Sequence, residues 1–169
     1  MAFDTLIKEH RDDLARIITA ETGKPLKESY GELDYGTSFT WFFAGEAERI
    51  QGTVSRGAVN GRRIFTVKSP IGVVGALVPW NFPVAMILRK LAAALAAGCT
   101  VVCKPSPETP LSALVLARLA IEAGFEPGVF NVVPCSNEST PAVAERLCRH
   151  PLVSKISFTG STNVVRSLR

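Results

Sequence analysis

Three short segments of this 169-residue sequence place polar residues or glycine directly after an apolar, β-branched run. The segments are Pro79–Asn81, Lys104–Glu108 and Thr159–Thr162. Open parallel sheets bind ligands at the carboxyl ends of their strands, so three such segments indicate a site for a nucleotide or a phosphate. A Rossmann G-x-G-x-x-G pattern is absent, because Gly72 and Gly75 precede or lie within the first of these runs.

Asn81 is the residue of these segments best suited to act on a carbonyl. Its side-chain amide is a neutral donor between Trp80 and Phe82, and such a donor stabilises an oxyanion that develops from a carbonyl. An ordinary turn asparagine is the alternative. Lys104 is a lone charge at the end of an apolar run, which suits a contact with a hydroxyl or a phosphate.

Two further candidates are a glycine and an arginine. Gly160 allows the backbone to approach a ligand closely, and the free amides of a helix start favour an anion. An ordinary helix N-cap is the alternative reading of this segment.

Arg89 is a guanidinium in an otherwise apolar segment, so it needs a partner. A carboxylate is its natural bidentate partner, supplied either by a substrate or by an internal salt bridge.

The stretch Ser69–Lys104 carries the first two of the strand ends. The run Ile71–Val78 is short and rich in Val and Ile, which predicts a strand. Pro83–Ala97 opens with proline, is rich in Ala and Leu and precedes Gly98, which predicts a buried helix. Thr100–Lys104 is a second β-branched run. Strand, helix and strand in this order form a βαβ unit with parallel strands.

The remainder of the chain continues this alternation. We expect one helix over residues 110–123, capped by Thr109, and another over residues 141–149. Strands are expected at Val129–Val133 and Lys155–Thr159. Together these elements predict an α/β fold built on a partial doubly wound, Rossmann-like parallel sheet.

Two helices are expected before the sheet. Thr5–Thr22 has the pattern of an amphipathic helix, and a longer helix runs from Leu26 to Gln51. Arg62–Lys68 alternates in polarity, which predicts a half-exposed strand. Aromatic side chains recur at helical spacing on the longer helix, and we expect them to lie in the core: Tyr30, Phe39, Trp41, Phe42 and Phe43.

The expected organisation has three parts. Residues 1–68 form a helical segment with one strand, residues 69–162 form the α/β domain, and residues 163–169 form a divergent tail. The net charge of +4 comes from scattered Lys and Arg, which argues against a nucleic-acid partner. No apolar stretch reaches about 18 residues without a charge, which argues against a membrane span. We expect a cytoplasmic protein, while a mitochondrial location stays open.

The four cysteines indicate neither a disulfide nor a metal site. Cys99 and Cys103 flank an apolar strand and would lie about 13 Å apart on it, too far for a disulfide. The sequence contains no C-x-x-C pair, and His10 and His150 are isolated. We therefore expect free, incidental thiols.

Several motifs occur in the order and spacing of a known family. P-W-N-F-P at Pro79–Pro83, K-P-S at Lys104–Ser106 and S-F-T-G-S-T at Ser157–Thr162 resemble the cofactor-binding half of the aldehyde dehydrogenase superfamily. Within it, M-I-L-R-K at Met86–Lys90 is most similar to succinate-semialdehyde dehydrogenases. The resemblance extends over residues 6–162.

This resemblance implies a role for each candidate. Asn81 matches the oxyanion-stabilising amide, and Arg89 matches an arginine that holds the substrate carboxylate. Many NAD-preferring relatives place a glutamate three residues after the lysine; here that position is Pro107 and Glu108 follows it. The cofactor is NAD or NADP, with a slight lean to NADP or dual use. The cofactor contacts implied are Pro79, Trp80, Lys104, Pro105, Ser106, Pro107, Gly128, Phe158, Gly160, Ser161 and Thr162.

The implied activity is oxidation of succinate semialdehyde to succinate with NAD(P)+, in 4-aminobutanoate degradation. The family's E-L-G-G and G-Q-x-C motifs, which carry the base and the nucleophilic cysteine, do not occur in this sequence. We therefore expect a chain truncated at both ends and inactive alone. The alternative is a nucleotide-binding or assembly module without catalysis. The expected partner is a small aldehyde, and members of the family form homo-oligomers.

Overall fold

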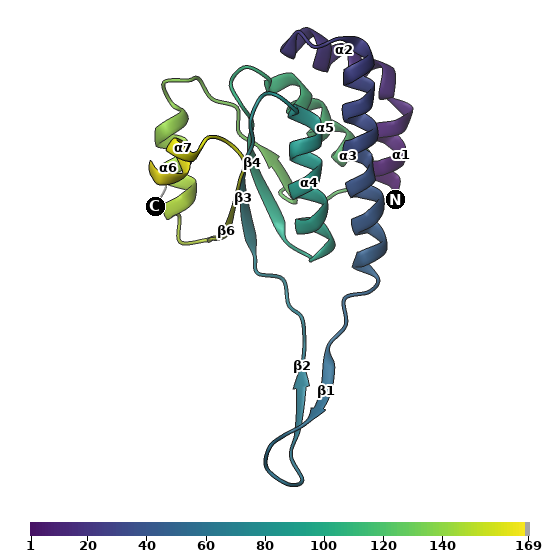
Figure 1. Ribbon diagram of the computed structural model, residues 1–169, viewed down its shortest axis with the longest axis vertical. Coiled ribbons are helices and arrows are strands. Elements are labelled where there is room, and N and C mark those ends of the chain that lie inside the picture. The colour runs from purple at the N-terminus through teal and green to yellow at the C-terminus, as the bar shows by residue number, and fades with distance from the viewer. Residues whose placement is uncertain (168–169) are drawn as a thin grey trace.

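The computed structural model describes residues 1–167, and the side chains of residues 1–164. Three parts are visible: an α/β layer, a group of N-terminal helices packed on one side of it, and a hairpin that projects away from both (Figure 1). No helix in the described range is both long enough and apolar enough to cross a membrane.

The α/β layer is built on a four-stranded parallel sheet with the strand order β5-β4-β3-β6. Its strands are β3 (Val73–Leu77), β4 (Thr100–Lys104), β5 (Phe130–Val132) and β6 (Val153–Phe158). Leu77 lies opposite both Lys104 and Phe158, so three of the strands end at the same level. The predicted α/β class and parallel sheet are confirmed.

Helices cover both faces of this sheet. Helices α4 and α5 lie on one face, whereas α6 and α7 lie on the other (Figure 1). Because β4 and β5 follow β3 to one side and β6 returns to its other side, the order of the strands reverses between β3 and β6. The bounds of these helices are α4 (Pro83–Ala96), α5 (Pro110–Glu122), α6 (Thr140–Arg149) and α7 (Thr162–Ser167). Helix α7 takes up part of the predicted tail, and residues 168 and 169 of that tail lie outside the described residues.

Three helices, not the two expected, precede the sheet. They are α1 (Ala2–Glu9), α2 (Arg11–Thr22) and α3 (Leu26–Ala47). The predicted helix Thr5–Thr22 divides at His10, whose ψ of 21° departs from helical geometry. Gly23 ends α2 in the left-handed conformation, with φ of 74°. Helix α3 ends four residues before the predicted Gln51.

The prediction that the aromatic side chains of α3 lie in the core was wrong for Trp41 and Phe42, which are 63% and 52% exposed. The buried face of α3 consists of Ser29, Glu32, Leu33, Gly36, Thr37 and Thr40. A Cβ on Gly36 would lie 3.0 Å from Leu88 Cδ1 of α4. Helix α3 therefore packs so closely on α4 that only small or short side chains fit along most of the contact.

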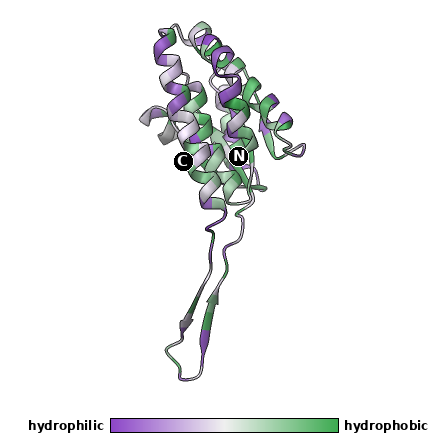
Figure 2. Cartoon of the chain, turned by 90° about the vertical axis from the view of Figure 1, so that its right-hand side faces the viewer, coloured by the Kyte–Doolittle hydropathy of each residue, from purple (hydrophilic) through white to green (hydrophobic). Residues whose placement is uncertain are grey.

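The hairpin consists of β1 (Thr53–Arg56) and β2 (Arg63–Thr66), which pair antiparallel. The sequence indicated only the second strand. Every residue of both strands is exposed, and the hairpin extends well beyond the helices in two perpendicular views (Figures 1 and 2). Val54, Phe65 and Val67 are 65%, 68% and 83% exposed.

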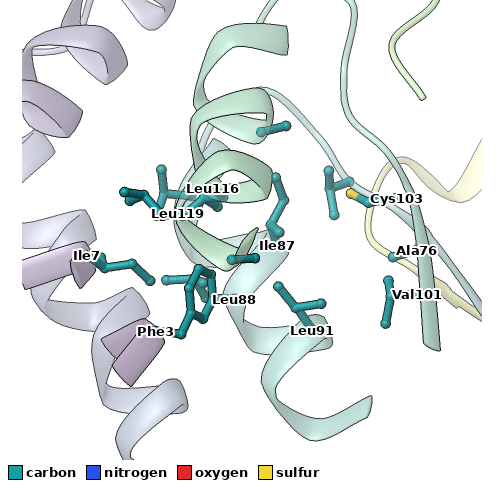
Figure 3. Close-up of a cluster of buried hydrophobic side chains, with 14 of the residues drawn as sticks. Phe3, Ile7, Ala76, Ile87, Leu88, Leu91, Val101, Cys103, Leu116 and Leu119 are labelled. Atoms are coloured by element: carbon teal, nitrogen blue, oxygen red, sulfur yellow. The ribbon is translucent and has the colours of Figure 1, made fainter. Parts of the chain in front are cut away.

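One core joins the N-terminal helices to the α/β layer. Figure 3 shows Ile7 and Phe3 of α1 against Leu88 of α4, with Leu116 of α5 and Val101 of β4 in the same cluster. The core therefore crosses the boundary expected between residues 68 and 69.

Candidate functional site

A cleft of about 250 Å³ opens at the carboxyl ends of β3, β4 and β6. It lies where the strand order reverses, the position at which open α/β sheets bind ligands. Eight of the predicted cofactor contacts line it: Pro79, Trp80, Lys104, Ser106, Pro107, Phe158, Gly160 and Ser161.

Three other predicted contacts lie outside the lining of the cleft. Pro105 is buried between two of the lining residues, and Thr162 starts α7 directly after Ser161. Gly128 lies at the opposite edge of the sheet, in the turn before β5, with φ of 91°. The positive φ suits glycine in a tight turn, and the cofactor contact of Gly128 stays a prediction.

Lys104 is the buried cation of the cleft. It is 5% exposed, and its ammonium forms no ion pair with the side chains of residues 1–164. A buried ammonium needs oxygen partners. The cleft can therefore satisfy Lys104 with hydroxyl or phosphate oxygens of a ligand.

Glu108 brings a carboxylate into the same cleft. The Ser106 hydroxyl donates a hydrogen bond to it. This bond, with smaller contributions from the Glu108 backbone amide and the Asn137 side chain, lowers the pKa of Glu108. Although the glutamate is displaced by one position from the family pattern, the structure thus keeps an ionised carboxylate beside Lys104.

Gly160 forms a tightly packed wall of the cleft. A Cβ at this position would lie 2.5 Å from Cζ of the Phe158 ring. Any larger residue would have to displace the ring, so the present packing of Phe158 favours glycine here. The cleft therefore has the features that suit a dinucleotide: a wall without side-chain bulk, a buried cation and an apolar surface at Trp80.

Asn81 lies in the turn between β3 and α4, and it is exposed. In the described part of the chain its side-chain amide makes no hydrogen bond, whereas its backbone carbonyl accepts one from Lys24 Nζ at 2.7 Å. The amide is thus available to a ligand. Trp80 and Phe82 beside it are 53% and 41% exposed.

The first turns of α4 and α5 are capped by carboxylates from the N-terminal helices. Glu32 of α3 accepts the amides of Val84 and Ala85, at 2.8 and 3.1 Å. Glu21 of α2 accepts the amide of Leu111 at 2.6 Å and that of Ser112 at 2.9 Å. Neither contact was visible in the sequence, because each links segments far apart in the chain.

The predicted cap of α5 by Thr109 was therefore wrong. Thr109 is the residue before the helix, but its buried hydroxyl has no hydrogen-bond partner among the described residues. The reason is that Glu21 already occupies the amides that this hydroxyl was expected to accept.

A second hollow, of about 300 Å³, lies beside α4 and collects Arg89, Lys90 and Lys155. The Arg89 guanidinium lies 5.8 Å from the centre of the Phe39 ring and forms no ion pair in the described range. The internal salt bridge considered for Arg89 is thus not seen there. The hollow can accept a carboxylate.

Lys90 links this hollow to the cleft, a role that the sequence did not indicate. Its Nζ donates to Thr159 Oγ1, and Thr159 lines the cleft. Burial lowers the pKa of Lys90, and the charge of Arg89 lowers it further. The only sign of this lowered pKa in the sequence is that Arg89 and Lys90 are adjacent.

Within residues 1–167 no group of three or more His, Cys, Asp and Glu side chains could hold a metal ion. All four cysteines are free thiols. Burial raises the pKa of Cys103 to about 12, so this thiol is protonated and poorly nucleophilic.

The family model described as "Aldehyde dehydrogenase family" matches residues 1–169. The chain is 55% identical over 163 residues to Succinate-semialdehyde dehydrogenase, mitochondrial, of Homo sapiens, covering 96% of this chain and 30% of that protein. It is 54% identical over 163 residues to Succinate-semialdehyde dehydrogenase (NADP(+)) GabD of Escherichia coli, covering 96% of this chain and 33% of that protein.

Solved structures show the same similarity. A crystal structure described as an E. coli NADP dependent enzyme has a TM-score of 0.94 and 53% identity, over 99% of this chain and 34% of that one. Succinate-semialdehyde dehydrogenase from Burkholderia pseudomallei has a TM-score of 0.94 and 47% identity, with the same two coverages. Betaine aldehyde dehydrogenase from Staphylococcus aureus, in complex with NAD+, has a TM-score of 0.93 and 36% identity, over 99% and 33%. The chain thus spans about a third of the length of the relatives it matches.

Proposed function

Because this chain belongs to the aldehyde dehydrogenase family, we propose that it supplies the coenzyme cleft and the carbonyl-facing amide of an NAD(P)-dependent succinate-semialdehyde dehydrogenase. The observation that carries the proposal is the cleft where the strand order reverses, which gathers eight of the predicted cofactor contacts. The names of the relatives at 54–55% identity support the choice of substrate.

We propose that the coenzyme lies across the end of the sheet. Lys104 would hold the adenosine ribose, Gly160 and Ser161 would receive the pyrophosphate, and Trp80 and Pro79 would line the path to the nicotinamide. Bound NAD(P)+ supplies the hydride acceptor of aldehyde oxidation. The fit rests on the buried cation and on the wall at Gly160 described above.

The substrate would be held by groups on and before α4. The free amide of Asn81 would donate to the aldehyde oxygen as negative charge develops on it, which lowers the barrier to attack on the carbonyl carbon. Arg89 would hold the distal carboxylate as a bidentate partner. Lys90 and Lys155 add positive charge to the same hollow.

Neither the E-L-G-G motif nor the G-Q-x-C motif occurs in these 169 residues. We therefore propose that the chain binds coenzyme but does not oxidise aldehydes alone. The absorbance of NADPH or NADH at ~340 nm, followed with succinate semialdehyde and either coenzyme, tests this point. Turnover above the rate without protein would contradict it.

Titration with NADH and with NADPH tests the cleft. Binding is followed by energy transfer from Trp80 to the reduced nicotinamide, in a chain that carries Trp41→Phe so that Trp80 is the only donor. Lys104→Met should weaken binding of both coenzymes, whereas the matched change Lys27→Met, at an exposed position, should leave it unchanged. A folded chain that binds neither coenzyme would overturn the proposal.

The projecting hairpin favours a second function, in assembly. A two-stranded hairpin alone is marginally stable in water, and this one exposes Val54, Phe65 and Val67. We propose that it pairs with another copy of the chain, as expected of a family of homo-oligomers. Light scattering during gel filtration measures the mass: Phe65→Ser should lower it to that of a monomer, whereas Ile121→Ser, an exposed apolar position on α5, should not.

A further inference from the structure

Lys24 and Glu32 form a buried ion pair at the junction between the N-terminal helices and the turn that carries Asn81. Lys24 Nζ lies 2.6 Å from Glu32 Oε2, and the two side chains are 12% and 0% exposed. Lys24 lies in the loop between α2 and α3, and Glu32 lies on α3. Both therefore belong to the segment that precedes the sheet.

Glu32 holds the downstream side of the turn. Its Oε1 accepts the amides of Val84 and Ala85 in the first turn of α4. First-turn amides have no partner within their own helix, and Phe82, the residue at the N-cap of α4, provides no side-chain cap. Glu32 thus caps α4, although it lies 52 and 53 residues from these two amides in the sequence.

Lys24 holds the middle of the same turn. Its Nζ donates to the carbonyl oxygen of Asn81 at 2.7 Å and lies 4.3 Å from the centre of the Phe82 ring. With the bond to Glu32, the ammonium has two hydrogen-bonded oxygens and an aromatic face. The backbone is therefore fixed at Asn81 itself and again three residues later.

Stability alone does not account for a pair of this kind. Replacing a buried ion pair with well-packed apolar residues is often neutral or stabilising, and an N-cap serine or aspartate would satisfy the amides more simply. What this pair adds is a fixed arrangement of the backbone: the carbonyl next to the Asn81 side chain and two amides that follow it are held by the same two residues.

We propose that Lys24 and Glu32 are positioning residues that fix the turn Pro79–Pro83 and thereby aim the side-chain amide of Asn81. Their contacts reach the backbone of the turn and leave the Asn81 amide free for a ligand. The proposal deepens the function proposed above and rests on it, since the value of a fixed Asn81 amide lies in the carbonyl that it meets.

Trp80 provides a direct test, because it adjoins Asn81 and Trp41 is the only other tryptophan. In the Trp41→Phe chain, the anisotropy decay and acrylamide quenching of Trp80 report the mobility of the turn. Lys24→Met keeps the length of the side chain and removes the charge, and Lys24→Arg keeps the charge. Lys27→Met, at an exposed position three residues later, is the matched control.

We expect Lys24→Met to speed the local motion of Trp80 at temperatures well below unfolding, Lys24→Arg to restore much of the parent signal, and Lys27→Met to match the parent. A purely structural role would lower the melting temperature and leave the Trp80 signal of the folded chain unchanged. That result would overturn the inference, as would a Lys24→Arg signal equal to that of Lys24→Met.

Hydrogen exchange on the unmodified chain tests whether Glu32 holds the first turn of α4, and it needs no variant to fold. The exchange rates of the Val84 and Ala85 amides should be lower than those of uncapped first-turn amides by a factor of about ten or more. Rates equal to those of an uncapped turn would contradict the inference. Both readouts work without coenzyme. If the turn is held as expected but NADH does not bind, the proposed function fails and the positioning of the turn stands.

Discussion

The edge of the sheet where the strands end has two halves with opposite character. In the capped half, the first turns of α4 and α5 receive the carboxylates of Glu32 and Glu21. In the open half, at the ends of β3, β4 and β6, the cleft holds Lys104 with no ion pair in the described chain and Gly160 with no side chain.

This difference decides where an anion can bind. The start of a helix carries a partial positive charge and free amides, which favour an anion. In the capped half, two carboxylates of the chain itself already use that capacity. The open half is therefore the part of the edge that remains for the phosphates of the dinucleotide we propose.

Glu32→Ala should disturb the capped half most. The change leaves Lys24 buried without its carboxylate and removes the acceptor of two amides, so we expect a loss of about 3–5 kcal/mol in the free energy of unfolding. Urea unfolding followed by circular dichroism measures it. Glu28→Ala, an exposed position one turn earlier on α3, should change the same quantity by less than about 0.5 kcal/mol. Equal effects of the two changes would contradict the assignment of the cap.

Glu21→Ala should have a smaller effect, because Glu21 is only partly buried. Loss of the cap of α5 should lower the free energy of unfolding by about 1–2 kcal/mol. Glu21→Gln keeps an acceptor and should lower it less. Amide exchange at Leu111 and Ser112 should quicken in Glu21→Ala while exchange at Val84 stays the same; a uniform increase would count against separate caps.

In the open half, Glu108→Gln should change the choice of coenzyme. A carboxylate hydrogen-bonds a ribose 2′-hydroxyl and repels a 2′-phosphate, so we expect the ratio of the NADP to the NAD dissociation constant to fall about tenfold, or ~1.4 kcal/mol. Glu138→Gln is the control, because Glu138 is exposed and follows Asn137 of the cleft in the sequence. An unchanged ratio in Glu108→Gln would remove Glu108 from the site.

The same glutamate sets a dependence on pH. Hydrogen bonds from Ser106 and the backbone lower the pKa of Glu108, so its carboxylate stays ionised through neutral and mildly acidic solution. The contribution of Glu108 to the discrimination against NADP should be constant from about pH 8 to 5 and weaken only below the ordinary glutamate pKa of about 4.3. Because a phosphate monoester titrates at about pH 6, the check compares the ratio of dissociation constants in the parent chain with that in Glu108→Gln at each pH. A difference between the two chains that changes near neutrality would contradict it.

The smallest effect is expected at the cysteines. Cys99 and Cys103 are buried, and burial raises the pKa of Cys103 to about 12. Cys135 is less buried and lies 3.5 Å from Thr140 Oγ1, a residue of the cleft. In the folded chain, iodoacetamide at pH 8 should label Cys135 well before Cys103, and NADH should slow that labelling. Peptide mass spectrometry measures both, and rapid labelling of Cys103 would contradict its burial.

Much of the open half was predictable because its signals are local. Strand β4 has the predicted bounds Thr100–Lys104, and Lys104, Ser106 and Gly160 line the cleft as expected. Composition and a following turn are enough to locate the end of a strand, and the ends of parallel strands must meet at one edge.

The capped half was not predictable from local pattern. Lys24 and Asn81 are 57 residues apart and Glu21 and Ser112 are 91 apart, so their pairing follows from the packing of whole helices. The same packing explains the error at Trp41 and Phe42. Large aromatic residues at helical spacing indicate a buried face, but the face of α3 that packs on α4 contains Gly36, and Trp41 and Phe42 lie outside it.

The hairpin of β1 and β2 also determines how the chain meets a protease. Its strands are fully exposed and carry Arg56 and Arg63, with Arg62 in the turn between them. Trypsin needs an exposed basic residue in a segment that opens easily, and this hairpin provides three in a part of the chain outside the shared core. A brief digestion would cut the molecule there first, between α3 and β3. Slower cleavage at higher protein concentration would support, without any substitution, the proposal that another copy covers the hairpin.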